Sequence, residues 1–253
     1  MPNSNPQQVD LDYLSNTLEA MEDEVKAAAA RLEKVIFIDM QSYLPEGDTF
    51  VTSYSVPMLF TIFENFVNSA LKLYRDHLQY EVIAQTLHFP AFAPEIRTTC
   101  LFSSISQLEG GIPADLDKRM KFADQLATFF GRSLSPSNIV VKMAGNIDLH
   151  VLNDCLRQLS LPLIDNKDKF YFGENETARL ESLLSELKSR RNKISHSIPV
   201  DGFVITKQDF TRFRAGVAYV CSKIHDLMLK AAQNRTYLSS APLAAPQPKF
   251  PAQ

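Results

Sequence analysis

The feature that most constrains the fold is a run of about thirty residues, 49–78, whose apolar side chains recur at the period of an α-helix. The run, TFVTSYSVPMLFTIFENFVNSALKLYRDHL, is apolar around much of its circumference, so it predicts a central helix that other helices surround. Pro57 is expected in the first turn of this helix or at a kink. Only eight glycines occur in 253 residues, which leaves few of the turns that a sheet protein needs. We therefore predict an all-α protein.

Further helices are predicted on both sides of the central one. Apolar residues recur every three or four positions over 11–35, which indicates a long first helix that ends before the LPEGD segment, 44–48. Residues 176–197 carry one apolar stripe and are followed by a proline, and residues 207–233 form a closing helix. These helices are expected to pack together as a bundle.

The pattern is irregular between about 81 and 172, where prolines and glycines cut short apolar runs. Several short helices are expected there. The run NIVVKM, 138–143, is compatible with a strand or with a buried helical turn. Residues 161–175 predict a polar loop that carries aromatic side chains. This part of the chain is interpreted as an irregular helical insertion in the bundle.

A single helical domain is predicted over residues 10–235. Residues 1–9 precede the first helical pattern, and residues 236–253 are rich in proline, alanine and serine. Such a composition cannot bury enough apolar surface to order itself. Both ends are therefore expected to be disordered.

Composition excludes several classes of function. The formal net charge of −3 gives no general attraction to polyanions, so any contact with nucleic acid has to be local. The three cysteines are odd in number and lack metal-ligand spacing, which favours a reducing compartment and predicts no metal site. The sequence contains no phosphate-binding loop motif, so no nucleotide cofactor is predicted. Because no apolar run reaches the length of a membrane span, we expect a cytoplasmic protein without membrane contact.

A basic stretch, LKSRRNKISHSIPV, ends the helix predicted over 176–197. Asn192 and His196 are four residues apart and share a helix face, whereas Arg191 lies about 140° around the helix from His196. A long arginine side chain could still reach the same pocket, or a second copy of the chain could complete it. The alternative interpretation is a helix end whose cations meet exposed carbonyls and the negative end of the helix dipole.

The order of these residues resembles the motif of the HEPN superfamily, in which arginine and asparagine are followed by an apolar residue, a small residue and histidine. Here Arg191 begins this order and His196 ends it. Residues 53–74 resemble the early helix of MAE-type and RiboL-PSP-type HEPN domains, with Glu64 followed by Phe66. The resemblance covers roughly 50–80 and 176–230. It implies a compact helical bundle that often dimerises.

The resemblance also implies a metal-independent endoribonuclease, without a cofactor, in a toxin–antitoxin or antiviral defence system. Cleavage by the ribose 2′-OH needs proton transfer and stabilisation of negative charge on phosphorus. His196 suits proton transfer, and Arg191 suits the phosphate oxygens as a permanently charged, planar donor. These two residues are the catalytic candidates. The RNA backbone would be held by Arg190 and Lys193.

Asn192 and Glu64 are candidates for supporting roles. Asn192 could orient the histidine or bind sugar or base. Glu64 lies on a mostly apolar helix, where a buried carboxylate usually needs a partner. A salt bridge from Glu64 to the motif arginine and simple exposure of Glu64 are both open.

The expected partners are RNA, a second copy of the chain that forms a composite active site, and an antitoxin or defence-system protein. HEPN toxins that a nucleotidyltransferase silences carry a tyrosine two residues after the histidine, where this chain has Ile198. Two other classes remain open. One is a non-catalytic HEPN module that binds RNA or a protein partner, and the other is a helical adaptor in which the basic stretch is only a cap.

Overall fold

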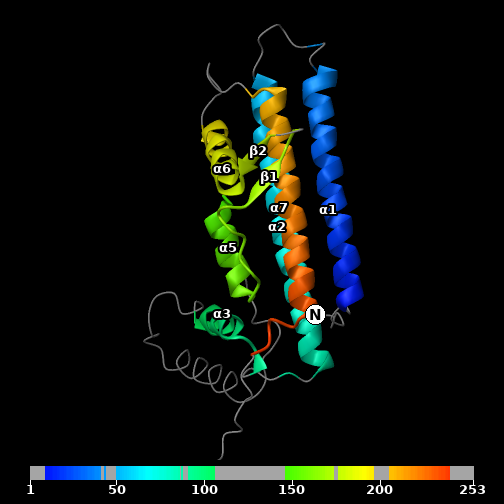
Figure 1. The fold of residues 1–253 in the computed structure, drawn as a ribbon, viewed down its shortest axis with the longest axis vertical. Coiled ribbons are helices and arrows are strands. Elements are labelled where there is room, and N and C mark those ends of the chain that lie inside the picture. The colour runs from blue at the N-terminus through cyan, green and yellow to red at the C-terminus, as the bar shows by residue number, and fades with distance from the viewer. Residues whose placement is uncertain are drawn as a thin grey trace, which may run out of the picture.

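A computed structural model describes residues 9–40, 43, 50–85, 87, 91–105, 146–173, 176–196 and 205–239, without the side chains of 50, 101–105, 195 and 196. Three long helices, α1, α2 and α7, run side by side along an elongated bundle (Figure 1). The shorter helices α6 and α5 lie along one side of these three, and α3 lies at one end. The predicted all-α fold class is confirmed.

Helix α1, Leu11–Lys34, matches the predicted first helix. It begins where the Asp10 carboxylate accepts a hydrogen bond from the backbone N–H of Tyr13 at 2.9 Å, which satisfies one of the free donors of the first turn. A π-helical segment, η1 (Val35–Asp39), continues the helix. The predicted break at 44–48 lies outside the described residues. The buried stripe of α1 includes Leu14, Leu18, Val25 and Ala29.

Helix α2, Phe50–Ala84, is the central helix and contacts α1, α6 and α7. Of the two expectations for Pro57, a position in the first turn is wrong, because Pro57 lies well inside the helix, and a kink at this residue stays a prediction. A proline there cannot donate a backbone hydrogen bond, and burial of neighbouring side chains such as Val56 and Phe60 offsets this loss. Among the described helices, none combines the length and the apolarity that a membrane span requires.

The predicted short helices between 81 and 172 include α3, Pro94–Ile105, and α5, Leu149–Gln158. Residues 138–143 lie outside the described part of the chain. The prediction of a loop over 161–175 is partly wrong, because residues 169–171 form a strand.

This strand, β1 (Lys169–Tyr171), pairs antiparallel with β2 (Thr177–Arg179). Helix α6, Leu180–His196, therefore begins four residues later than the predicted 176. The strand is too short for its alternating pattern to be visible in the sequence. It forms because Phe170 is buried against α7, next to Gly216.

Helix α7 spans Lys207–Gln233, as predicted. A capping box between Thr206 and Asp209 fixes its start. The chain after α7 stays packed as far as Tyr237, which is buried and donates a hydrogen bond from its hydroxyl to Glu81 Oε2 at 2.9 Å. The predicted disordered tail over 236–253 therefore begins too early. At the other end Val9 is buried, and its carbonyl accepts a hydrogen bond from His77 Nδ1 at 2.8 Å, so the predicted disorder over 1–9 extends too far.

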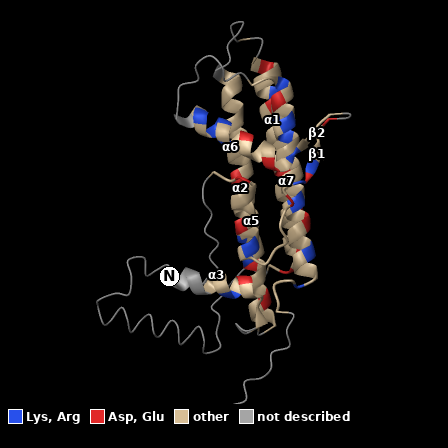
Figure 2. Ribbon diagram, turned by 60° about the vertical axis from the view of Figure 1, so that its left-hand side comes forward, with Lys and Arg blue, Asp and Glu red and all other residues tan. Residues whose placement is uncertain are grey.

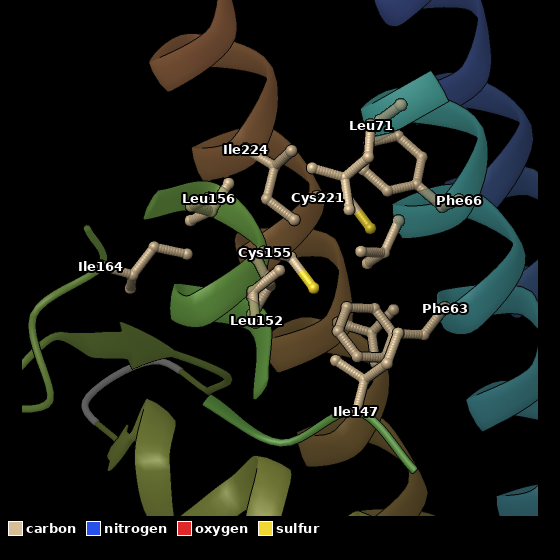
Figure 3. Close-up of a cluster of buried hydrophobic side chains, with 14 of the residues drawn as sticks. Phe63, Phe66, Leu71, Ile147, Leu152, Cys155, Leu156, Ile164, Cys221 and Ile224 are labelled. Carbon is tan, nitrogen blue, oxygen red and sulfur yellow. The ribbon is translucent and has the colours of Figure 1, made fainter. Parts of the chain in front are cut away.

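Part of the core forms where α2, α5 and α7 meet, and two thiols lie in it (Figure 3). Cys155 of α5 and Cys221 of α7 are buried free cysteines. Burial raises the pKa of both thiols, which keeps them protonated and poorly nucleophilic. They pack as small apolar side chains, so the chemistry of this protein has to be sought among other residues.

Candidate functional site

The basic stretch lies at the end of α6, because the apolar stripe of this helix packs it onto α2 and α7. The stripe buries Leu180, Leu183, Leu184, Leu187 and Ile194. Lysines and arginines gather near the C-terminal end of α6 (Figure 2). Packing of the leucines thus determines which polar side chains of the motif face a neighbouring helix.

Arg191 points toward α2 and is half-buried. Its Nη1 donates hydrogen bonds to Asn146 Oδ1 at 2.7 Å and to Asn192 Oδ1 at 3.0 Å. The Cζ atom of its guanidinium lies 5.6 Å from the centre of the Phe60 ring on α2, within the range of a cation–π interaction. Three neutral groups therefore hold the guanidinium in place.

Asn146 joins Arg191 to the central helix. Its φ of 66° lies in the left-handed region, which asparagine tolerates better than most residues. Its backbone N–H donates to Glu64 Oε1 at 2.8 Å. Neither of the two expectations for Glu64 is met, because its half-buried carboxylate binds the backbone of Asn146 instead of pairing with Arg191 or facing solvent alone.

Arg190 points to a different side of α6, toward α7. Its Nε donates to Glu186 Oε1 at 2.9 Å, and its Cζ lies 5.7 Å from the centre of the Phe213 ring. Arg212 of α7 binds the other oxygen of Glu186 at 2.8 Å and also covers Phe213. The positive charge of Arg190 is thus shared with a carboxylate, and the two adjacent arginines of the motif do not form one basic patch.

Asp148 fixes the segment that carries Asn146. It caps α5 by accepting a hydrogen bond from the backbone N–H of Val151 at 2.9 Å, and it forms an ion pair with Lys188 of α6 at 2.7 Å. Burial raises the pKa of Asp148, but hydrogen bonds from Lys188 and Val151 outweigh burial and leave the pKa below its ordinary value. The start of α5 is therefore tied to α6 by a carboxylate that stays ionised at neutral pH.

The remaining predicted site residues are dispersed around the end of α6. Asn192 is half-buried beside Arg191, and Lys193 is exposed. His196 is the last residue of α6, and its side chain lies outside the described part of the structure. The structure brings Arg191, Asn192 and, through Asn146, Glu64 together, and it turns Arg190 away from them.

Sequence reasoning missed Asn146 and Phe60. Phe60 was predicted only as part of an apolar helix. Asn146 precedes the capping Asp148, in a position where an asparagine in a turn is unremarkable. No periodicity connects it with Arg191, which is 45 residues further along the chain. Only the packing of α5 against α6 brings the two together.

The site is a polar cluster at a helix end and contains no grouped metal ligands. In the ranges that the structure describes, no three histidine, cysteine or acidic side chains gather in a way that could hold a metal ion. A cavity of about 430 Å³ lies between α1 and α2, and one of about 440 Å³ lies between α1, α7 and the β1–β2 hairpin. Neither is lined by a residue of the motif. The polar cluster around Arg191 therefore lies outside both cavities.

The fold and the polar cluster around Arg191 together define a class of protein. It is a helical bundle with an arginine–asparagine site at the end of α6. Residues 11–237 match the model of the MAE_28990-like HEPN family, and the chain belongs to this family. The match confirms the resemblance seen in the sequence, and it also includes the first helix and residues 81–172. No curated protein and no solved structure matches the chain significantly.

Proposed function

We propose that this HEPN protein is a metal-independent endoribonuclease that cleaves RNA by attack of a ribose 2′-oxygen. The observation that carries the proposal is the environment of Arg191. Its guanidinium is held by two amide oxygens and an aromatic ring, and no carboxylate of the described residues lies within ion-pair distance of it. A fixed cation whose charge is not compensated by the protein is suited to bind an anion.

The comparison with other cations of the same helix supports this argument. Lys188 pairs with Asp148, and Arg190 pairs with Glu186. Both serve to join neighbouring helices, because each carboxylate also binds a second element. Arg191 has no such carboxylate partner in the described residues, and its charge remains available for phosphate oxygens.

In the proposed reaction, the 2′-hydroxyl passes its proton to a water molecule and its oxygen forms a bond to phosphorus, while the bond from phosphorus to the 5′-oxygen breaks. The leaving 5′-oxygen takes up a proton, and the products are a 2′,3′-cyclic phosphate and a 5′-hydroxyl. Arg191 would stabilise the negative charge that builds up on the phosphate oxygens. His196 would transfer the proton to the leaving oxygen, since a helix C-terminus favours its charged form.

Other parts of the proposal concern binding and assembly. Asn192 would support the site, and Arg190 and Lys193 would contact the RNA backbone. A second copy of the chain would bring its own motif opposite the first and form a composite active site in a homodimer. The enzyme would act in the cytoplasm as a toxin or an antiviral effector that an antitoxin or another defence protein controls.

The test is cleavage of a fluorescently labelled RNA in the presence of EDTA. Wild-type protein is expected to release a product that ends in a cyclic phosphate and to leave the 2′-deoxy version of the same oligonucleotide intact. Arg191→Ala and His196→Ala should each reduce the cleavage rate by about two or more orders of magnitude. Arg157→Ala and His150→Ala, at exposed positions of α5, are the matched controls and should cleave at the wild-type rate.

Binding without cleavage by the wild type would contradict the ribonuclease proposal and favour the non-catalytic module. If cleavage survives both Arg191→Ala and His196→Ala, the activity belongs to other residues or to a contaminant. Light scattering tests the dimer separately, because a protein that stays monomeric at all concentrations cannot form a composite site.

A further inference from the structure

The polarity of the hydrogen bonds around Arg191 indicates what the cluster can bind. Arginine has only donors, and here it directs Nη1 at the side-chain oxygens of Asn146 and Asn192. In each asparagine the amide nitrogen lies on the other branch of the same planar group. Both amide nitrogens are therefore directed away from Nη1, and each carries two N–H donors.

The resulting cluster presents donors and few acceptors. The acceptor atoms of both amides are engaged by the arginine, and the Glu64 carboxylate is engaged by the backbone of Asn146. All three donor side chains are half-buried, so they are ordered and still reach solvent. Donor groups around one positive charge match a phosphodiester oxygen, which is a pure acceptor.

We propose that Asn146, Asn192 and Arg191 form a donor clamp for a single phosphodiester group of RNA, and that Asn146 binds the phosphate directly. This inference rests on the proposed function for the identity of the ligand. Asn146 comes from the segment that precedes α5, outside the motif helix, and so the clamp closes only when α5 packs against α6.

Glu64 sets the direction of Asn146. It holds the backbone N–H of a residue whose left-handed φ of 66° fixes the direction of the side chain. A carboxylate that bound Arg191 directly would cancel the charge of the clamp. Bound to the backbone of Asn146, it positions the amide and leaves the guanidinium without a carboxylate partner among the residues that the structure describes. Glu64 is thus a positioning residue that acts through Asn146.

Two substitutions of Asn146 separate a role in ligand binding from a structural role. Aspartate and glycine both tolerate the left-handed φ that Asn146 has. Asn146→Asp keeps shape and the bond to Arg191, but it removes the two N–H donors and pairs the guanidinium with a carboxylate. Asn146→Gly keeps the left-handed backbone and removes the amide. Asn166→Asp, at an exposed position of the loop before β1, adds the same charge elsewhere and is the matched control.

The measurement is fluorescence anisotropy of a labelled 2′-deoxy oligonucleotide, which retains the phosphates and cannot be cleaved by 2′-oxygen attack. Inorganic phosphate serves as the competitor. Asn146→Gly is expected to weaken binding about 10-fold, the usual effect of losing a hydrogen bond to a charged group, and Asn146→Asp about 100-fold. The melting temperature of Asn146→Asp should not fall, because its new ion pair replaces a hydrogen bond.

The outcomes distinguish this inference from the proposed activity. Binding that falls in the order wild type, glycine, aspartate supports the clamp, even if the wild type cuts no RNA and the ribonuclease proposal fails. If the Asn146→Asp protein is folded and binds the oligonucleotide as tightly as the wild type, the clamp is overturned. This holds even if cleavage still depends on Arg191 and His196. A wild type that does not bind the oligonucleotide, or equal weakening by Asn166→Asp, also overturns it.

Discussion

Arg190 and Arg191 are adjacent in the chain, yet they face different neighbouring helices and have different surroundings. Arg190 meets a carboxylate, Glu186, which a second arginine from α7 shares. Arg191 meets two amides and a ring. A step of about 100° around the helix turns one residue toward α7 and the next toward α2. Whether a carboxylate compensates the charge, more than the charge itself, therefore distinguishes a structural arginine from a candidate binding group.

The largest effect is expected from Arg191→Lys, which retains the charge of the arginine that has no carboxylate partner among the described residues. Lysine lacks the planar set of donors that contacts two amides and a phosphate together. We expect kcat/KM for RNA cleavage to fall by roughly two orders of magnitude, with little change in the melting temperature. If the lysine variant cleaves like the wild type, charge alone is sufficient and the geometry around Arg191 is irrelevant.

A smaller effect is expected from the compensated arginine. Arg190→Ala should weaken RNA binding only slightly and in a salt-dependent way, without abolishing cleavage, because Glu186 already shares the charge of Arg190. It should also lower stability by about 1 kcal/mol, since the ion pair with Glu186 and the cover over Phe213 are lost. Filter binding at several salt concentrations and urea unfolding measure the two effects. A loss of activity equal to that of Arg191→Ala would remove the distinction between the two arginines.

An intermediate effect is expected from Glu64, which positions Asn146 beside Arg191. Glu64→Gln keeps an oxygen that can accept from the backbone N–H of Asn146, and it should retain most of the cleavage activity. Glu64→Ala removes the acceptor and should reduce kcat/KM about 10-fold, as expected when a buried donor loses its partner. Wild-type activity of the alanine variant would contradict the positioning role. An equally large loss in both would show that the charge of Glu64 is used.

The smallest effect is expected from the ion pair between Asp148 and Lys188. Asp148→Asn keeps a residue that caps a helix well and removes the charge. Because folding lowers the pKa of Asp148, its contribution to stability is full above its ordinary pKa of about 4 and is lost as pH falls through the lowered value. Wild type and variant should therefore differ by about 1 kcal/mol or less at pH 7 and converge in strong acid, as measured by urea unfolding. A difference that stays constant down to the acid range would show that the ion pair does not contribute.

The sequence predicted the main helices because their apolar residues recur at helical period over long stretches, as in α2 and α7. It could not predict the β1–β2 hairpin, whose strands have three residues each. At the site, order of residues was sufficient to nominate Arg191 and Asn192. The partners Asn146 and Phe60 depend on how α5, α6 and α2 pack, and a local pattern does not carry this information.

Helix α7 approaches α6 closely at Gly216. A Cβ atom at Gly216 would lie 2.6 Å from Leu183 Cδ2 and 3.0 Å from Phe170 Cζ, so a methyl group fits there only if the Leu183 side chain shifts. Glycine has a poor helix propensity, but its lack of a side chain permits this close contact. Gly216→Ala would press on α6 about 12 Å from Arg191, counted along the helix axis. Such a substitution offers a route to a heat-sensitive allele, in which warming loosens the motif helix while the chemical groups of the site stay unaltered.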